Sequence, residues 1–358
     1  MKEKRIAFTG GGTAGHVMVN LALIPHFLEK GWQVDYIGSY DGIERELIQA
    51  LDGVEYFPIS TGKLRRYMSK ENFKDPFKVA KGTLQAWNIL RKRKPKVIFS
   101  KGGFVSVPVV VASRFHRIPT IIHESDLTPG LANRLAAPFV QVMLTTFPET
   151  VDYVKKKDVR YIGPIIREEL FQGDRLNGER LTNFSQKKPV LLVMGGSSGS
   201  QKINENLRKA LPELLPRYQI IHLCGKGNVD DTLKQKGYVQ FEYVKDELKH
   251  LFAITDLVIS RAGANAIFEL LALQLPMLLI PLSLGASRGD QIDNAQSFHE
   301  KGVAHVLEEE ALTPHRLVEA IDQLNEEKNT IRERMQAYNY RASRKEVLTL
   351  IEQLAKRK

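Results

Sequence analysis

Two glycine-rich turns carry the residue types that most clearly predict chemistry. The first, residues 10–16, reads GGGTAGH, and the second, residues 195–200, reads GGSSGS. Each follows a predicted strand and opens a predicted helix. Glycine lets the backbone approach a phosphate, and the unpaired N–H groups at a helix start favour an anion. The pair predicts a diphosphate-bearing ligand held between two halves of the chain, and His16 adds a titratable imidazole to the first turn.

The first turn has alternative interpretations. It fits the pattern G-x-G-x-x-G, which is typical of a dinucleotide site. That fingerprint requires an acidic residue at the end of the second strand, whereas Asp35 lies in the middle of it. A nicotinamide dehydrogenase needs one such turn, while a transferase that holds a donor and an acceptor can use two. A tight turn with an exposed histidine, and a purely structural origin for both turns, remain open.

Two further loops of the first half follow predicted strands. Residues 100–108 read SKGGFVSVP, and residues 123–126 read HESD. Ligands of open α/β sheets bind outside the carboxyl ends of the strands. We therefore expect both loops to share a crevice with His16. For His123 and Glu124, a buried structural pair and a role toward substrate are equally open.

The second half carries a helix start and a polar loop that suit a sugar nucleotide. Residues 260–265 read SRAGAN, and Glu269 lies in the first turns of the helix that follows. A carboxylate near a helix start is favourable by itself; the functional alternative is that Glu269 accepts two ribose hydroxyl protons. Residues 288–294, RGDQIDN, offer the directional hydrogen bonds that discriminate between sugar hydroxyls.

The sequence predicts neither a metal site nor a cofactor. It contains no D-x-D motif and no Cys/His cluster with metal-ligand spacing. A departing diphosphate would then be stabilised by helix N-termini and by an arginine. Arg167, just beyond the predicted domain boundary, is the candidate.

Short β-rich runs alternate with amphipathic stretches along the chain. They cover residues 5–8, 33–38, 97–100, 120–123 and 142–145, and then 190–194, 219–223, 256–260 and 277–280. This alternation implies parallel sheets with right-handed crossovers. The prediction is an α/β protein with two Rossmann-like domains facing across a cleft. They cover residues 1–163 and 164–340, and a C-terminal helix, 341–358, joins the first.

Length and composition limit the class of protein. The 358 residues suit two domains, and 43% hydrophobic with 26% charged residues is ordinary for a globular protein. Cys224 is the only cysteine, so an intramolecular disulfide is impossible and a reducing compartment is expected. Neither a signal peptide nor an apolar run of ~20 residues is present. We expect a cytoplasmic protein, with contact to a membrane surface left open.

Positive charge is concentrated in one segment. Residues 63–96 hold twelve Lys or Arg against Glu71 and Asp75, which gives +10 of the chain's net +11. Apolar side chains recur there at helical spacing: Phe73, Phe77, Leu84, Trp87 and Leu90. This pattern favours an anionic membrane surface, with each Lys or Arg adding about 1 kcal/mol. Nucleic acid is the alternative polyanion, but no RNA or DNA motif supports it.

Six ordered motifs resemble those of one transferase family. They are residues 11–16 (GGTAGH), 101–104 (KGGF), 123–124 (HE) with 129–133 (PGLAN), 195–197 (GGS), 261–264 (RAGA) with Glu269, and 290–291 (DQ) with Asn294. The chain resembles the MurG family, which has the GT-B fold and serves bacterial peptidoglycan synthesis. Its members move N-acetylglucosamine (GlcNAc) from UDP-GlcNAc onto undecaprenyl-pyrophosphoryl-N-acetylmuramoyl-pentapeptide. The resemblance implies a donor-binding second domain and a first domain facing the acceptor at the cytoplasmic face of the membrane.

The resemblance also implies roles at matching positions. Arg167 and Ser197 would contact the diphosphate, and Glu269 the ribose. His16 is the candidate base, with Glu124 as its alternative. The residues implied for UDP-GlcNAc are Thr13, Ala14, Gly15, Arg167, Ser197, Val244 through its backbone at the uracil, Ala264, Asn265, Glu269, Gln291 and Asn294, the last two at the sugar. Those implied for the acceptor side are Gly102, Gly103, Phe104, Glu124, Asp126 and Asn133.

Several positions depart from the family's usual residues. Ala14 replaces a glycine, and Phe104 replaces a tyrosine hydroxyl. Residues 125–126 are Ser-Asp where Gln-Asn is usual, and Asp290 replaces a glutamine. Because these positions line presumed substrate surfaces, they leave the peptide or lipid form of the acceptor open more than the reaction.

The predicted reaction is an inverting transfer. The acceptor C4 hydroxyl attacks the anomeric carbon while His16 or Glu124 removes its proton, and closure of the domains excludes water. A GT-B transferase for another lipid acceptor, such as diacylglycerol, is the nearest alternative. An NAD(P)-dependent oxidoreductase and a non-enzymatic lipid- or nucleic-acid-binding protein are the others.

Overall fold

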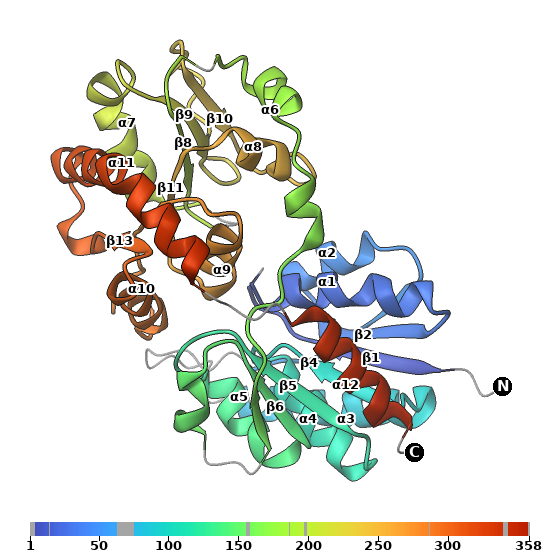
Figure 1. The fold of residues 1–358 in the computed structure, drawn as a ribbon. Helices are drawn as coiled ribbons and strands as arrows, with labels where there is room; N and C mark the ends of the chain where they lie inside the picture. Colours follow the sequence, from blue (N-terminus) through green and yellow to red (C-terminus); the bar gives the residue numbers. More distant parts are fainter. Residues whose placement is uncertain are drawn as a thin grey trace. The chain divides into compact units, whose positions relative to one another are not determined.

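The chain folds into two compact units. In the computed structural model, the first comprises Met1–Ile166 with Tyr340–Lys358, and the second Arg167–Asn339 (Figure 1). The structure describes residues 4–13, 15–62, 75–154, 158–185, 187–196, 199–285, 287–338 and 343–356. Each unit is built on a parallel sheet with helices on both faces, which confirms the predicted fold class.

The first unit contains a seven-stranded sheet in the order β3-β2-β1-β4-β5-β6-β7, with every neighbouring pair parallel. The strands are β1 (Arg5–Thr9), β2 (Gln33–Ser39), β3 (Val54–Ile59), β4 (Val97–Ser100), β5 (Thr120–Glu124), β6 (Val142–Thr145) and β7 (Val159–Tyr161). The helices are α1 (Gly15–Glu29), α2 (Ile43–Gln49), α3 (Asp75–Arg93), α4 (Ser106–Phe115), α5 (Leu131–Ala136) and α12 (Arg344–Lys356), with short 3₁₀ turns η1 (Ala137–Phe139) and η2 (Glu149–Tyr153).

Alternation along the buried strands divides the core of this unit between the two faces of the sheet. In β1, Ile6 and Phe8 join the cluster beneath α1 and α12, while Ala7 joins the cluster beneath α3 and α4. Successive side chains of a strand point to opposite faces, and Figure 1 shows these helix pairs on opposite sides of the sheet.

The C-terminal helix and the boundary segment share this first core. Val347 and Ile351 of α12 are fully buried in the cluster that contains Ile6. Ile165 belongs to the same cluster. Residues 164–166, which the sequence analysis assigned to the second domain, therefore lie in the first unit, because Ile165 buries its side chain there.

The second unit contains a six-stranded sheet in the order β10-β9-β8-β11-β12-β13, again with parallel neighbours. The strands are β8 (Val190–Met194), β9 (Gln219–Leu223), β10 (Tyr238–Phe241), β11 (Leu257–Ser260), β12 (Met277–Leu279) and β13 (Ala304–Val306). The helices are α6 (Arg175–Thr182), α7 (Gln201–Leu214), α8 (Leu248–Ile254), α9 (Ala264–Ala272), α10 (Asp290–Glu300) and α11 (Pro314–Ala337), with η3 (Glu168–Gln172) and η4 (Glu309–Ala311).

The strands that the sequence analysis missed are β3, β7, β10 and β13, and each lies at an edge of its sheet. Inner strands such as β4 and β11 are buried throughout. They read as short apolar runs, as strands covered on both faces do. The edge strands are only partly buried. Their mixed polar and apolar sequences therefore lack the signal on which the prediction depended.

Candidate active site

Strand order determines which loops meet at the carboxyl edge of each sheet. The order reverses between β1 and β4 in the first unit and between β8 and β11 in the second. Open α/β domains bind ligands at such a switch point. The loops involved are residues 10–16 and 100–104 in the first unit, and 195–200 and 261–265 in the second. Each glycine turn therefore lies beside a second loop that the sequence analysis had selected.

The turn before α1 orients the half-buried ring of His16. Nδ1 lies 3.0 Å from the carbonyl oxygen of Gly11 and 3.2 Å from Thr13 Oγ1. A carbonyl oxygen can only accept, so the contact with Gly11 is a hydrogen bond when Nδ1 carries the proton, and we assign that tautomer. The neutral ring then has its lone pair on Nε2, which is the tautomer that a general base acting through Nε2 requires. Ala14 lies outside the described residues.

The 100–104 loop packs closely against this turn. The Gly11 N–H donates to the carbonyl oxygen of Gly102 at 3.3 Å. Gly103 has a φ of +80°, and a Cβ there would lie 2.2 Å from the Gly11 carbonyl oxygen, so only glycine fits. Phe104 is half-buried in the same loop. This close approach gives Gly102 and Gly103 a structural role at the His16 turn.

Glu124, the alternative base, is already saturated with hydrogen-bond donors. Its Oε1 accepts from the backbone N–H groups of Ser125 and Asp126 at 2.9 and 3.1 Å. Its Oε2 accepts from the Gly130 N–H and from Asn133 Nδ2, both at 2.9 Å. A buried carboxylate whose two oxygens already accept four hydrogen bonds fixes the loop that supplies the donors. We propose that Glu124 and Asn133 hold the 125–133 loop, in place of catalysis and acceptor binding.

His123 and Lys101 are buried beneath these loops. Burial lowers the pKa of His123 well below its usual range, and the charge of Lys101 lowers it further. The ring of His123 is therefore neutral at pH 7, and it stacks on Phe99 with centroids 6.3 Å apart. Burial also lowers the pKa of Lys101, whereas Glu124 and Asp126 oppose that shift. This arrangement favours the structural interpretation of the His123–Glu124 pair.

Replacing Glu124 by alanine should reduce stability without moving the pH profile of catalysis. The change leaves several buried donors unsatisfied, which costs roughly 1–3 kcal/mol for each such group. Denaturant unfolding measures the loss, and Glu46→Ala, at an exposed position on α2, is the control. A shifted acidic limb in the pH profile of kcat, with stability unchanged, would contradict the structural role.

The second glycine turn is shaped for close backbone approach. Gly196 has a φ of +90°, and a Cβ on it would meet open space. Gly199, with a φ of +74°, packs so closely on the Cys224 carbonyl that a Cβ would lie 2.0 Å from its oxygen. Ser200 then caps α7, its Oγ accepting from the Ile203 N–H at 3.4 Å. Ser197 lies outside the described residues.

The buried side chain of Arg261 connects the loops around this turn by hydrogen bonds. Its guanidinium donates to Ser200 Oγ at 2.6 Å, to the Ile280 carbonyl at 3.2 Å and to the Glu309 carboxylate. Arg261 and Glu309 are both buried. The arginine of the RAGA motif therefore fixes the ends of β11 and β12 to the start of α7. Glu309 was not predicted from the sequence, because it lies 48 residues from its partner.

Arg167 and Glu269, predicted to contact different parts of the donor, contact each other. Arg167 Nε and an Nη donate to the two oxygens of Glu269 at 2.8 and 3.0 Å, a bidentate pair. Both side chains are mostly buried. Burial lowers the pKa of Arg167, but its hydrogen bond to Glu269 and that residue's charge raise it overall. The pair fixes the Arg167 guanidinium against Glu269, the sixth residue of α9.

The start of α9 has the features of an anion site. Gly263 is its N-cap and, within the described residues, no side chain caps the helix there. A Cβ on Gly263 would meet open space. Ala264 and Asn265 form the first turn, where the helix dipole places partial positive charge. The start of α9 and Arg167 suit an anionic ligand, and the Glu269 carboxylate suits a ligand with hydroxyl groups.

Asn294, one of the two residues predicted to contact the sugar, is buried beside the turn before α9. Its side chain is fully buried, and Nδ2 donates to the Ala262 carbonyl at 3.2 Å. In this conformation it supports the turn before α9 and has no surface for a ligand, so we replace the predicted sugar contact by this role. Gln291 is half-buried, and its Oε1 accepts from the Leu282 N–H at 3.1 Å. Val244 lies in the loop after β10.

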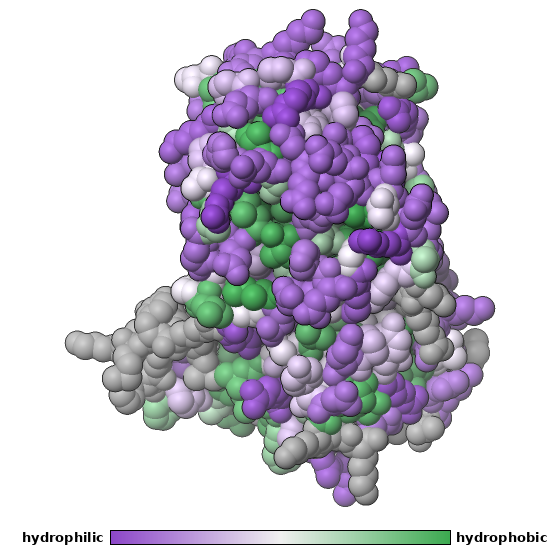
Figure 2. Space-filling model, turned by 60° about the vertical axis from the view of Figure 1, so that its left-hand side comes forward, coloured by the Kyte–Doolittle hydropathy of each residue, from purple (hydrophilic) through white to green (hydrophobic). Residues whose placement is uncertain are grey.

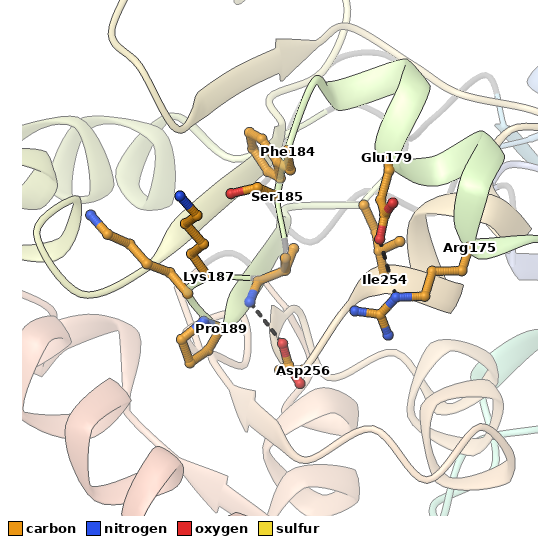
Figure 3. A pocket seen from close by; sticks show the side chains of 10 residues that line it. Arg175, Glu179, Phe184, Ser185, Lys187, Pro189, Ile254 and Asp256 are labelled. Atoms are coloured by element: carbon orange, nitrogen blue, oxygen red, sulfur yellow. Dashed lines mark hydrogen bonds and ion pairs between the residues drawn. The ribbon is translucent and has the colours of Figure 1, made fainter.

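A pocket of about 270 Å³ lies at the opposite edge of the second sheet, at the start of β8 (Figure 3). Three of its charged lining residues have partners: Arg175 pairs with Glu179 at 3.2 Å, and Asp256 accepts from the Val190 N–H at 2.9 Å. Because ligands of these folds bind at the carboxyl ends of strands, this pocket is not the candidate active site. Among the described residues, no group of three or more His, Cys, Asp or Glu side chains is placed to hold a metal ion.

Comparison with known proteins identifies the family of this chain. Residues 6–145 match the glycosyltransferase family 28 N-terminal domain, and residues 190–354 match the family 28 C-terminal domain. The chain belongs to glycosyltransferase family 28. The resemblance to the MurG transferases is confirmed by relatives along the whole chain. The family 28 protein of Oceanobacillus iheyensis named UDP-N-acetylglucosamine--N-acetylmuramyl-(pentapeptide) pyrophosphoryl-undecaprenol N-acetylglucosamine transferase is 60% identical over 354 residues, 99% of each chain.

Other family 28 relatives and solved structures extend the comparison. A protein of the same name from Staphylococcus carnosus is 53% identical over 348 residues, 97% of this chain and 96% of its own. The crystal structure of Acinetobacter baumannii MurG aligns with a TM-score of 0.76 at 24% identity, covering 98% of this chain and 99% of that one. A glycosyltransferase of kitacinnamycin aligns with a TM-score of 0.75 at 17% identity, covering 99% and 100%. At these identities the structures support the fold.

Proposed function

We propose that this protein transfers GlcNAc from UDP-GlcNAc to the C4 hydroxyl of undecaprenyl-pyrophosphoryl-N-acetylmuramoyl-pentapeptide, with inversion at the anomeric carbon. The observation that carries the proposal is the 60% identity over 99% of the chain to a relative whose name gives this reaction. The two candidate sites supply the groups it needs: a base in the first unit and a diphosphate site in the second. The reaction is one step of peptidoglycan synthesis.

The donor half of the proposal rests on the second unit. The diphosphate lies at Gly196, at the start of α9 and at Arg167, where partial positive charge from the helix and the guanidinium stabilise the departing UDP. Glu269 accepts the ribose hydroxyl protons, and the backbone at Val244 meets the uracil. Gln291 remains the candidate for the sugar.

The base belongs to the first unit. His16 Nε2 takes the proton of the acceptor hydroxyl as the bond to the anomeric carbon forms and the bond to UDP breaks. Donation from Nδ1 to the Gly11 carbonyl at 3.0 Å supports this tautomer. Thr13 and Gly15 of the same turn remain candidates for contact with the donor, and Phe104 and Asp126 remain the candidates for contact with the acceptor.

An assay with separate arms tests the function. The purified protein should convert UDP-GlcNAc and the undecaprenyl-linked acceptor to product and UDP, and it should be stabilised thermally by UDP. Diacylglycerol as sole acceptor and NADH as sole ligand test the alternatives. Turnover with diacylglycerol alone, or a thermal shift with NADH but not UDP, would overturn the proposal.

A membrane surface is the partner that α3 suits. Phe77 and Leu84 lie seven residues apart on one helical face and are 78% and 66% exposed. Lys81 lies between them and is exposed. Phe73 falls outside the described residues, while Leu90 and Ala86 pack in the core. We place this helix at the anionic cytoplasmic face of the cell membrane. Crossing a bilayer takes a longer and more apolar helix than any that the structure describes.

Exposed apolar side chains also occur outside α3. Figure 2 shows a face on which hydrophilic side chains predominate and hydrophobic ones form separate patches. Such scattered apolar side chains are normal for a folded protein. An exposed apolar pair with a lysine between them on one helix is the feature that favours lipid headgroups.

Reversing the charge of Lys81 should weaken binding to anionic vesicles. Each Lys near a charged leaflet contributes about 1 kcal/mol, so Lys81→Glu should reduce the partition coefficient by roughly 10-fold or more at low salt. Cosedimentation with vesicles containing phosphatidylglycerol measures this. Lys209→Glu, at an exposed position on α7, is the control and should bind as wild type. Equal loss in both variants would show a general charge effect.

A further inference from the structure

We propose that Glu44 positions His16 through the peptide unit between Gly11 and Gly12, so that a carboxylate, a peptide and an imidazole form one hydrogen-bonded relay. Glu44 lies in the first turn of α2, which follows β2, the strand next to β1. The inference rests on the proposed function, because it assumes that His16 acts as the base.

The carboxylate of Glu44 is enclosed by the turn. Its side chain is fully buried. Oε2 accepts from the Gly12 N–H at 3.1 Å, and Oε1 accepts from the Ser39 N–H at 3.0 Å. A Cβ on Gly11 or on Gly42 would lie within 2.6 Å of the carboxylate oxygens. Glycine at these positions is therefore what allows a buried carboxylate to reach the backbone of the turn.

A single peptide unit connects this carboxylate to the histidine. The N–H of Gly12 and the C=O of Gly11 belong to the same planar amide and point in opposite directions. Glu44 fixes the N–H end, so the oxygen is directed to the other side, where His16 Nδ1 lies 3.0 Å away. Negative charge at the N–H end polarises the amide and strengthens the bond at its oxygen.

This arrangement also gives the two glycine turns different roles. In the first turn, the Gly12 N–H donates to the Glu44 carboxylate. The buried negative charge of Glu44 beneath the turn disfavours a phosphate there. In the second, Gly196 faces open space. The first turn therefore serves the orientation of His16, while the second keeps the features of a diphosphate site.

The titratable groups around Glu44 determine how the activity should depend on pH. Tyr36 of β2 and Tyr56 of β3 lie beside Glu44; burial raises the pKa of each, and the charge of Glu44 raises it further. Both are therefore neutral at pH 7. Arg45 is the cation nearest in sequence, and it opposes the shift at Tyr56. On the side of the β4 loop, the Lys101 side chain lies against Gly10.

The test is Glu44→Gln, which keeps the shape but removes the charge. We expect kcat to fall by about 10- to 100-fold, by analogy with carboxylates that orient metal-ligating histidines, with KM for UDP-GlcNAc unchanged. The acidic limb of the kcat pH profile should move to lower pH, because the imidazolium loses a nearby negative charge. Tyr56→Phe, which removes a hydroxyl that donates to the Ser39 carbonyl at 2.6 Å, is the control and should leave the limb in place.

The outcomes separate the relay from the proposed function. If His16→Ala lowers kcat but Glu44→Gln leaves the pH profile unchanged, the relay is wrong and the base stands. If His16→Ala retains activity, the base is wrong. Should Glu44→Gln not fold, the ¹⁵N spectrum of the wild-type His16 ring, assigned by its absence in His16→Ala, decides: protonated Nδ1 supports the relay, and protonated Nε2 overturns it.

Discussion

Replacing His16 by alanine should lower kcat by about 10²- to 10⁴-fold, the usual contribution of a general base, while the affinity for UDP remains that of the wild type. Most residues proposed to bind the donor lie in the second unit, in which Arg167 and Glu269 hold each other at 2.8 and 3.0 Å. The substitution removes the Nε2 lone pair and leaves those groups in place. Steady-state kinetics with both substrates, and calorimetric titration with UDP, measure the two quantities separately.

A matched histidine variant tests whether the effect is specific. His315 lies on α11, is 77% exposed and contacts Glu319, so His315→Ala should behave as wild type. Turnover of His16→Ala within about threefold of wild type would remove His16 from the mechanism. A parallel loss of UDP affinity would instead indicate that the 10–16 turn contacts the donor directly, as the resemblance implies for Thr13, Ala14 and Gly15.

Replacing Glu269 by alanine should weaken UDP binding by about 10- to 100-fold, because a hydrogen bond to a charged group contributes roughly 1.5–3 kcal/mol. Two effects combine. The ribose loses its acceptor, and Arg167 loses the bidentate partner that holds it against α9. Calorimetric titration with UDP, and with the uracil nucleotide that lacks the ribose 2′-hydroxyl, measures the loss.

A double-mutant cycle separates these effects. If Glu269 acts only by holding Arg167, Glu269→Ala should cause no further loss of UDP affinity in an Arg167→Ala background. UDP and its 2′-deoxy analogue should then lose affinity equally in Glu269→Ala. If Glu269 accepts from the ribose, part of the loss should persist and should be smaller for the deoxy analogue. Glu326→Ala, at an exposed position on α11, is the control. Unchanged UDP affinity in Glu269→Ala would exclude the ribose role.

The strands show where the sequence was sufficient. Inner strands such as 97–100 and 190–194 were predicted with the bounds that the structure gives, because burial on both faces requires a short apolar run that is visible in the sequence. The edge strands β3, β7, β10 and β13 were missed because they are only partly buried and so need no apolar run. Their pairing is with one neighbour only, and it is decided by the sheet they join, more than by their own composition.

The candidate site divides in the same way. The glycine turns and the His16 position were predictable, because a phosphate or a close-packed loop requires glycine at a strand end, and the ordered motifs identified the family. The residues that hold the site were not. Glu44 is 32 residues from Gly12, and Arg167 is 102 residues from Glu269. No local pattern records such contacts.

The sequence by itself determined the family, the α/β class and the positions of the loops that carry the chemistry, since each of these depends on local residue type and spacing. Only the tertiary structure decided what the side chains do. It placed β2 beside β1, which brings the Glu44 carboxylate under the first glycine turn. It also buried Asn294 and gave Glu124 its four donors. The reason is that burial and hydrogen-bond partners are set by strand order, which packing of distant segments determines.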